Sequence, residues 1–222
     1  MKLQNEKIIF LRNNSESWEI FQEQDGVQAL PKYESFIMIP EGKIGTKVDY
    51  RVIPSLRTEK NQADASRWAT HYAIISRFLK SNKEYMFVCE DTIELLENKI
   101  SIIENLIEKN TIILLADSKN PSQAYILDRD IAKIIQQNAY IYYTTWDKML
   151  YDMKDLGLIN LKNTPILSKY NSLNKYWYEY LFLIVLVLFM LFIFNMLCPF
   201  NGFALYRNCL TDKSCNVSCT EG

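Results

Sequence analysis

Two hydrophobic patterns divide the chain. From residue 1 to about 156, short apolar runs typical of buried strands alternate with stretches in which apolar residues recur at helical spacing. The expected strands cover residues 7–11, 35–39, 48–53, 85–89, 111–116 and 140–144; the expected helices follow residue 15 and cover 64–79, 93–106 and 146–153; and 124–135 reads as a strand passing into a helix. Strands that alternate with helices in this way predict an α/β domain over residues 1–156.

The second pattern is one long apolar stretch near the C-terminus. YLFLIVLVLFMLFIFNMLC, from Tyr180 to Cys198, contains no charge and one strongly polar side chain, Asn195. As a helix it spans roughly 28 Å at about 1.5 Å per residue, close to the hydrocarbon thickness of a bilayer. Aromatic residues precede it, as at a membrane interface. We expect a single transmembrane helix over 177–198, since a buried core helix rarely lacks a polar face over five turns.

The flanking segments predict how this helix is oriented. A polar tether is expected over 157–176 and a short tail over 199–222. The N-terminus lacks an apolar run long enough for a cleaved signal peptide, so we expect a cytosolic domain anchored by its C-terminal helix. The tail holds three cysteines and a glycosylation triplet at Asn216, which favours a lumenal or extracellular tail, in a cell or in the membrane of an enveloped virus.

Charge argues against one class of partner. The 222 residues include 25 Lys and Arg and 26 Asp and Glu, a formal net charge of −1, without a basic cluster. Proteins that bind nucleic acid through a basic face carry a positive excess, so no nucleic-acid partner is expected.

The candidate chemistry lies where the strand over 85–89 ends in Glu90, Asp91 and Thr92. Ligands of open α/β sheets bind beyond the carboxyl ends of strands. Two carboxylates there suit a divalent cation, Mn²⁺ or Mg²⁺, which could neutralise a diphosphate. The alternative is structural: Asp91 and Thr92 cap the next helix, and its dipole favours Glu90.

Several segments, taken in order, resemble glycosyltransferase family 25, which contains lipooligosaccharide and collagen galactosyltransferase-like proteins. IIFLRNNSESWEIF is similar to the family's opening strand and turn, and Thr70-His71 in WATHYAIISRFLKS to its Ser-His pair. YMFVCEDT is similar to its strand ending in Glu-Asp-Asp. AYILDRDIAKII and Thr145-Trp146-Asp147 are similar to later family segments.

The resemblance implies a GT-A-like, Rossmann-like domain that transfers a sugar, often galactose, from a nucleotide-sugar donor to a glycan, lipid or protein acceptor. It implies that Glu90 and Asp91 lie at the metal and diphosphate, that His71 lies near the nucleotide, and that Asp147 contacts the acceptor or acts as general base. The structural alternatives are a helix histidine satisfied by its neighbours and an acidic residue at a helix N-terminus.

Two departures from the family pattern support a second interpretation. Thr92 replaces the second Asp of the motif, and the interval from Asp91 to Tyr125 is short. The alternative function is therefore a catalytically inactive glycosyltransferase-like membrane protein with a structural or interaction role. A Cys or Ser hydrolase is disfavoured because His71, the single histidine, has no recognisable triad context.

Overall fold

The structure is a computed structural model of the chain, and it describes residues 2–39, 62–139, 144–170 and 172–197. Within the last range, side chains are described from Leu181 to Ile193. The chain divides into two compact units, residues 1–170 and residues 171–222, and each is considered by itself.

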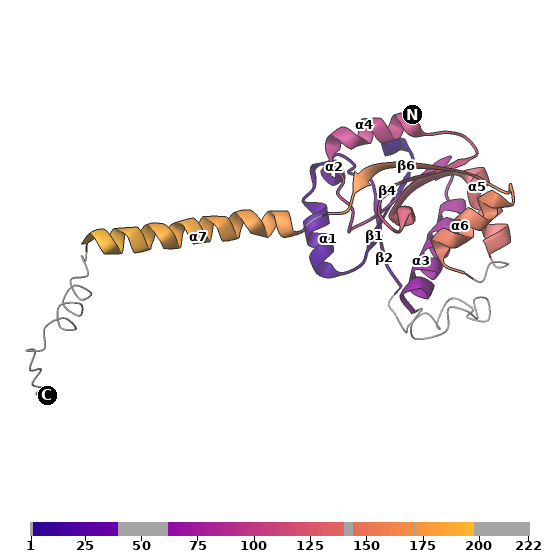
Figure 1. Cartoon of the computed structure of the whole chain (residues 1–222). Coiled ribbons are helices and arrows are strands. Elements are labelled where there is room, and N and C mark those ends of the chain that lie inside the picture. The colour runs from indigo at the N-terminus through magenta and orange to yellow at the C-terminus, as the bar shows by residue number, and fades with distance from the viewer. Residues whose placement is uncertain (1, 40–61, 140–143, 171, 198–222) are drawn as a thin grey trace, which may run out of the picture. The chain divides into compact units, whose positions relative to one another are not determined.

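The described part of the first unit is built on one mixed sheet (Figure 1). Its six strands are β1 Lys7–Arg12, β2 Glu34–Ile37, β3 Tyr85–Glu90, β4 Thr111–Asp117, β5 Ala124–Asp128 and β6 Asn160–Ser168, in the spatial order β2-β1-β3-β5-β4-β6. β1 pairs in parallel with both β2 and β3, and β4 pairs in parallel with β6. β5 lies antiparallel between β3 and β4. All the strands except β5 therefore run in one direction.

Helices cover both faces of this sheet (Figure 1). One face is covered by α3 Gln62–Leu79, α5 Arg129–Asn138 and α6 Trp146–Asp155, and the other by α1 Ser15–Gln22, α2 Asp25–Gln28 and α4 Glu97–Leu106. Because side chains alternate along a strand, Ile9 and Leu11 of β1 enter the first core and Ile8 and Phe10 enter the second. Short 3-10 turns, η1 Leu3–Asn5 and η6 Pro121–Gln123, complete the described elements.

The α/β expectation is confirmed, and the sheet with helices on both faces is Rossmann-like in general kind. The strands expected over 7–11, 85–89 and 111–116 are present, and 124–135 does pass from β5 into α5. The strand expected over 48–53, and residues 140–143 of another, lie outside the described residues.

The expected tether over 157–176 is wrong, and so is the domain boundary at residue 156. β6 lies in this segment and pairs with β4, so the first unit continues to Tyr170. An edge strand is paired on one side only and mostly exposed; Leu167 is its one buried residue. The alternation of buried and exposed positions was therefore too weak to predict a strand.

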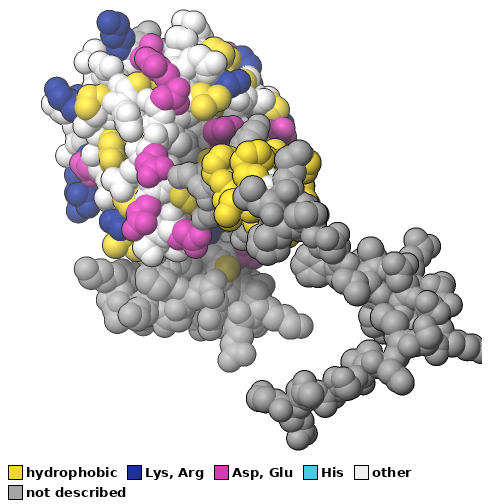
Figure 2. Space-filling model, turned by 90° about the vertical axis from the view of Figure 1, so that its left-hand side faces the viewer, with side chains coloured by type: hydrophobic (Ala, Val, Ile, Leu, Met, Phe, Trp, Pro, Cys, Tyr) yellow, Lys and Arg dark blue, Asp and Glu magenta, His cyan; other side chains and the backbone are white. Residues whose placement is uncertain are grey.

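Helix α7, Ser172–Leu197, belongs to the second unit and includes residues 177–197 of the expected helix. Its large described side chains, Leu181 to Phe192, are 46% to 68% exposed. In Figure 2 they form a group of hydrophobic side chains without an intervening charge. Among the residues whose side chains the structure describes, which in α7 are Leu181 to Ile193, no helix has both the length and the apolar character required to cross a membrane.

Candidate functional site

The candidate site lies where the order of the strands reverses. From β1 the chain first builds β2 on one side, and then returns to build β3 on the other side of β1. The crevice outside the carboxyl ends of two such strands is the usual ligand site of open α/β sheets. Asn13 directly follows β1 and Glu90 ends β3, with Leu11 and Glu90 opposite each other in the register. These two side chains therefore lie at the switch point.

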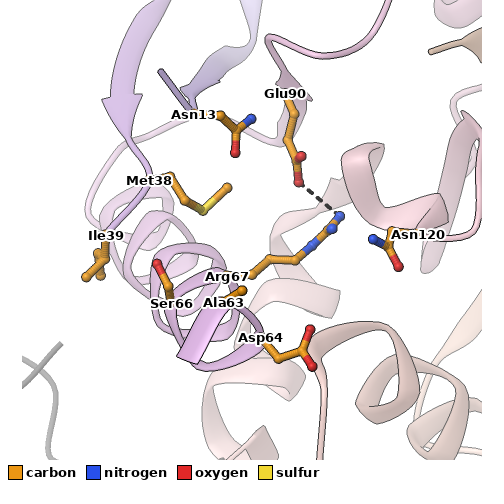
Figure 3. Close-up of a pocket in the computed structure, with 9 residues that line it drawn as sticks. All are labelled: Asn13, Met38, Ile39, Ala63, Asp64, Ser66, Arg67, Glu90 and Asn120. Atoms are coloured by element: carbon orange, nitrogen blue, oxygen red, sulfur yellow. Dashed lines mark ion pairs between the residues drawn. The ribbon is translucent and has the colours of Figure 1, made fainter. Parts of the chain in front are cut away.

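A pocket of about 490 Å³ opens at this edge, within the size range of small-molecule sites. We call it the switch-point pocket, and it is lined by Asn13, Met38, Ile39, Ala63, Asp64, Ser66, Arg67, Glu90 and Asn120. Figure 3 shows Arg67 extending from α3 toward Glu90, with Asn120 beside its guanidinium group. The lining therefore comes from strand ends on one side and from α3 on the other.

Glu90 is a buried, ion-paired carboxylate, only 3% exposed. Its Oε1 lies 2.9 Å from Nη2 of Arg67, and its Oε2 accepts a hydrogen bond from Nε2 of Gln123 at 3.2 Å. Burial acts to raise the pKa of Glu90, but the adjacent His71 ring and the Arg67 charge outweigh it, so the pKa lies below its ordinary value. Glu90 is therefore ionised at neutral pH.

His71 is fully buried one helical turn after Arg67. Its Nδ1 lies 3.1 Å from the Tyr125 hydroxyl, and its Nε2 lies 3.7 Å from Oε1 of Glu90, too long for a strong hydrogen bond. Burial lowers the pKa of His71 and raises that of Tyr125, so the imidazole is neutral and the phenol protonated. We assign the phenol as donor to Nδ1, which directs the Nε2–H toward Glu90.

Asp91 is also buried, 2% exposed, but its side chain binds the β1–α1 loop. Its Oδ2 accepts hydrogen bonds from the Asn13 backbone N–H at 2.9 Å and the Ser17 hydroxyl at 2.7 Å. Its Oδ1 accepts from the Asn13 amide at 2.7 Å. The helix-cap alternative for Asp91 is wrong, because α4 begins only at Glu97 and its N-cap is Leu96.

Asp147 lines a neighbouring pocket of about 500 Å³, which we call the Asp147 pocket. The other lining residues are Asp64, Arg67, Lys119, Asn120, Thr145, Trp146, Lys148, Tyr151, Asp152 and Asp155. Oδ1 of Asp147 accepts the Ser122 backbone N–H at 3.0 Å, and the Ser122 hydroxyl accepts from Nη2 of Arg67 at 3.3 Å. Asp147 is thus joined through Ser122 to Arg67, which lines both pockets.

The fold therefore brings His71, Glu90 and Asp147 together around Arg67 and places Asp91 beside Glu90, facing the β1–α1 loop. No group of three or more His, Cys, Asp or Glu residues that could hold a metal occurs among the described residues. Asn216 lies outside the described residues.

Sequence reasoning missed Arg67 and Gln123. Arg67 precedes His71 by four residues on α3, the spacing that puts two side chains on one helix face. That spacing is a usable signal for Arg67 once His71 is a candidate. No sequence pattern indicates Gln123, because its contact with Glu90 depends on where the fold places η6.

These features define the class of the molecule: an α/β protein of Rossmann-like general kind with a polar pocket at its switch point. No model of a known protein family matches the chain, and no curated protein matches it.

Proposed function

We propose that the first unit binds a nucleotide sugar in the switch-point pocket and transfers its sugar to an acceptor hydroxyl, as the resemblance to glycosyltransferase family 25 implies. The observation that carries the proposal is that three residues indicated by the sequence lie close to the same cation. Sequence motifs indicate His71, Glu90 and Asp147 separately, and the fold connects all three to one cation, Arg67. Glu90 pairs with Arg67 directly, His71 lies beside Glu90, and Asp147 is joined to Arg67 through Ser122. The pocket that Arg67 and Glu90 line lies at the strand ends where such ligands bind.

The two adjacent pockets support a division of labour. The donor occupies the switch-point pocket, and the acceptor occupies the Asp147 pocket, with Arg67 between them. Asp147 is partly exposed, and among the described residues only its Oδ1 has a hydrogen bond. Its Oδ2 is therefore our candidate for the general base, which must lie within hydrogen-bond reach of the attacking hydroxyl.

Helix α7 is proposed as a single-pass membrane anchor, with the first unit cytosolic and the tail on the other side. The support is the uncharged sequence from Tyr180 to Cys198 together with the exposure of the large apolar side chains from Leu181 to Phe192. Such an anchor would hold the domain at a surface where lipid-linked or membrane-protein acceptors are concentrated.

A second candidate function, an inactive transferase-like protein with a structural or interaction role, is favoured by one observation. Both oxygens of Asp91 are engaged by Asn13 and Ser17, and the next residue is Thr92 in place of a carboxylate. The acidic motif of the resembled family would then survive for its part in folding.

The test is to measure donor turnover, read as release of nucleoside diphosphate by the full chain in native membranes, across uridine and guanosine diphosphate sugars. Turnover is expected for at least one donor, and Asp147→Asn should lower kcat about 100-fold or more if Asp147 is the base. The matched control is Asp130→Asn, an acidic residue in the first turn of α5 as Asp147 is in α6. Donor binding without turnover would favour the inactive alternative.

A further inference from the structure

The acidic motif of this chain does not fit a divalent cation, because its charges are already met within the protein. Oε1 of Glu90 lies 2.9 Å from the Arg67 guanidinium, and Oε2 accepts from Gln123 at 3.2 Å. A divalent cation at Glu90 would lie close to the positive charge of Arg67, in a buried setting where like charges repel strongly. A metal could bind there only if Arg67 moved away.

The other two positions of the motif add no free ligand. Asp91 directs both oxygens at Asn13 and Ser17, with three hydrogen bonds of 2.7 to 2.9 Å. The Thr92 hydroxyl accepts from the same Gln123 amide that binds Glu90, at 3.2 Å. Arg67, Gln123 and Asn13 therefore contact the carboxylate oxygens that a shared metal would have to bind.

Arg67 is placed to supply the positive charge that a metal would otherwise provide. Its side chain is 14% exposed and lines both the switch-point pocket and the Asp147 pocket. In Figure 3 its guanidinium lies between Glu90 and Asn120. An arginine is always charged, and its planar fork matches phosphate oxygens. A cation that is part of the chain would not depend on the supply of a metal.

The guanidinium of Arg67 has five N–H groups, and not all of them have a hydrogen-bond acceptor among the described residues. Nη2 contacts Glu90 and Ser122, and Nη1 lies 3.1 Å from the Asn120 amide oxygen once that amide is turned to face it. Nε is buried and has no hydrogen-bond partner among the described residues. An Arg held on one edge by Glu90 and still short of acceptors is pre-oriented for an anionic ligand.

We propose that Arg67 replaces the divalent cation, so that the diphosphate of the donor binds to Arg67 without metal. The inference rests on the proposed function, because it concerns the same donor. Glu90 then acts as a positioning residue that fixes the guanidinium, and Lys119, which lines the Asp147 pocket, supplies a second positive charge nearby.

The experiment is calorimetric titration of the full chain in detergent with uridine diphosphate and with uridine and guanosine diphosphate sugars, in EDTA and in Mn²⁺. We expect one of these ligands to bind in EDTA with an affinity that Mn²⁺ changes by less than about threefold. Arg67→Gln should weaken binding at least tenfold, equivalent to about 1.4 kcal/mol, because the charge-assisted hydrogen bonds to the diphosphate are lost. Lys133→Gln, an exposed cation on α5, is the control and should not change binding.

Arg67→Gln leaves the Glu90 carboxylate buried without its ion pair, so this variant could lose binding because it misfolds. A second variant separates misfolding from a direct loss of binding. The double variant Arg67→Gln/Glu90→Gln removes both charges and should fold, as judged by circular dichroism, yet still fail to bind. Binding that requires Mn²⁺, or binding in EDTA that survives in the double variant, overturns the role of Arg67 and leaves the proposed function standing. No binding under either condition overturns both.

Discussion

Glu90 and Asp91 are adjacent in sequence and both buried, but their carboxylates contact different parts of the protein. Side chains of neighbouring strand residues point to opposite faces of a sheet, and Asp91 lies just beyond the end of β3. Glu90 accordingly turns toward α3 and Arg67, and Asp91 turns toward the loop that leads into α1. Glu90 therefore belongs to the lining of the switch-point pocket, and Asp91 belongs to the hydrogen bonds that hold the β1–α1 loop.

Asp91→Asn should destabilise the fold without a specific effect on ligand affinity. The amide can accept at one oxygen only, so part of the set of hydrogen bonds from Asn13 and Ser17 is lost. We expect the free energy of unfolding to fall by about 2–4 kcal/mol, measured by urea denaturation of the full chain in detergent. The exposed Asp130→Asn is the control, and an equal effect of the two substitutions would contradict this role.

The buried His71 predicts that acid destabilises the protein. Its pKa is lowered mainly by burial, so between that lowered pKa and the ordinary value of about 6.5 the unfolded chain binds more protons than the folded one. Stability is then complete above about pH 6.5 and is lost as pH falls through the folded pKa. The lowered pKa of Glu90 acts in the same direction at lower pH.

The slope of unfolding free energy against pH measures this effect. One group contributes at most about 1.4 kcal/mol per pH unit. Urea midpoints of the full chain should fall from pH 7 to pH 5, and His71→Gln should flatten the curve over that interval. A curve of unchanged slope in His71→Gln would show that the titration belongs to other groups.

Among the elements, β6 decides where the domain ends. It follows a turn at Gly157, whose φ of +71° is a conformation that glycine adopts without strain, and it then pairs with β4. β4 is buried over Ile112–Ala116, and without β6 one of its edges would have no hydrogen-bonded neighbour. β6 therefore completes the sheet, although its sequence is mostly polar.

Truncation tests this assignment. A chain ending at Tyr170 keeps β6 and Leu167 and should unfold in one cooperative thermal transition. A chain ending at Leu156 exposes the β4 edge and should aggregate or melt without a sharp transition. The measurement is circular dichroism on heating, with light scattering for aggregation. Equal cooperativity of the two chains would contradict a structural role for β6.

At the level of the whole molecule, the two units differ in whether their large apolar side chains are buried or exposed. The first unit buries them in two cores, one on each face of the sheet. In α7, by contrast, large apolar side chains from Leu181 to Phe192 are all exposed. Exposed apolar area on this scale in water is unfavourable and marks a surface that contacts lipid or protein. The membrane anchor proposed above is the lipid case.

Charge placed in α7 should release the chain from membranes. We expect the full chain to remain in the membrane fraction after carbonate extraction, and Leu186→Arg/Phe189→Arg to release it. An arginine at the centre of a spanning helix costs about 2.5–3.5 kcal/mol. Leu156→Arg, at an exposed position of the first unit, is the control. Retention of the double variant in the membrane would argue against a spanning helix.

The sequence by itself determined the α/β class and most of the elements, because both depend on local patterns. Apolar runs such as 85–89 and helical spacing such as 64–79 predict burial whatever the rest of the chain does. It also indicated Glu90, through the acidic residues at a strand end, and His71 and Asp147, through the resemblance to glycosyltransferase family 25. It failed at β6, where an edge strand has little burial to display.

The tertiary structure alone decided which of these side chains meet and what each contacts. That Arg67 pairs with Glu90, and that Asp91 holds the β1–α1 loop, follows from the packing of α3 against the sheet and from the pairing of β1 with β3. Such contacts join residues far apart along the chain, at distances set by the fold and not by sequence spacing. For that reason the sequence indicated where chemistry could occur, and only the structure put an arginine beside the carboxylate for which the sequence predicted a metal.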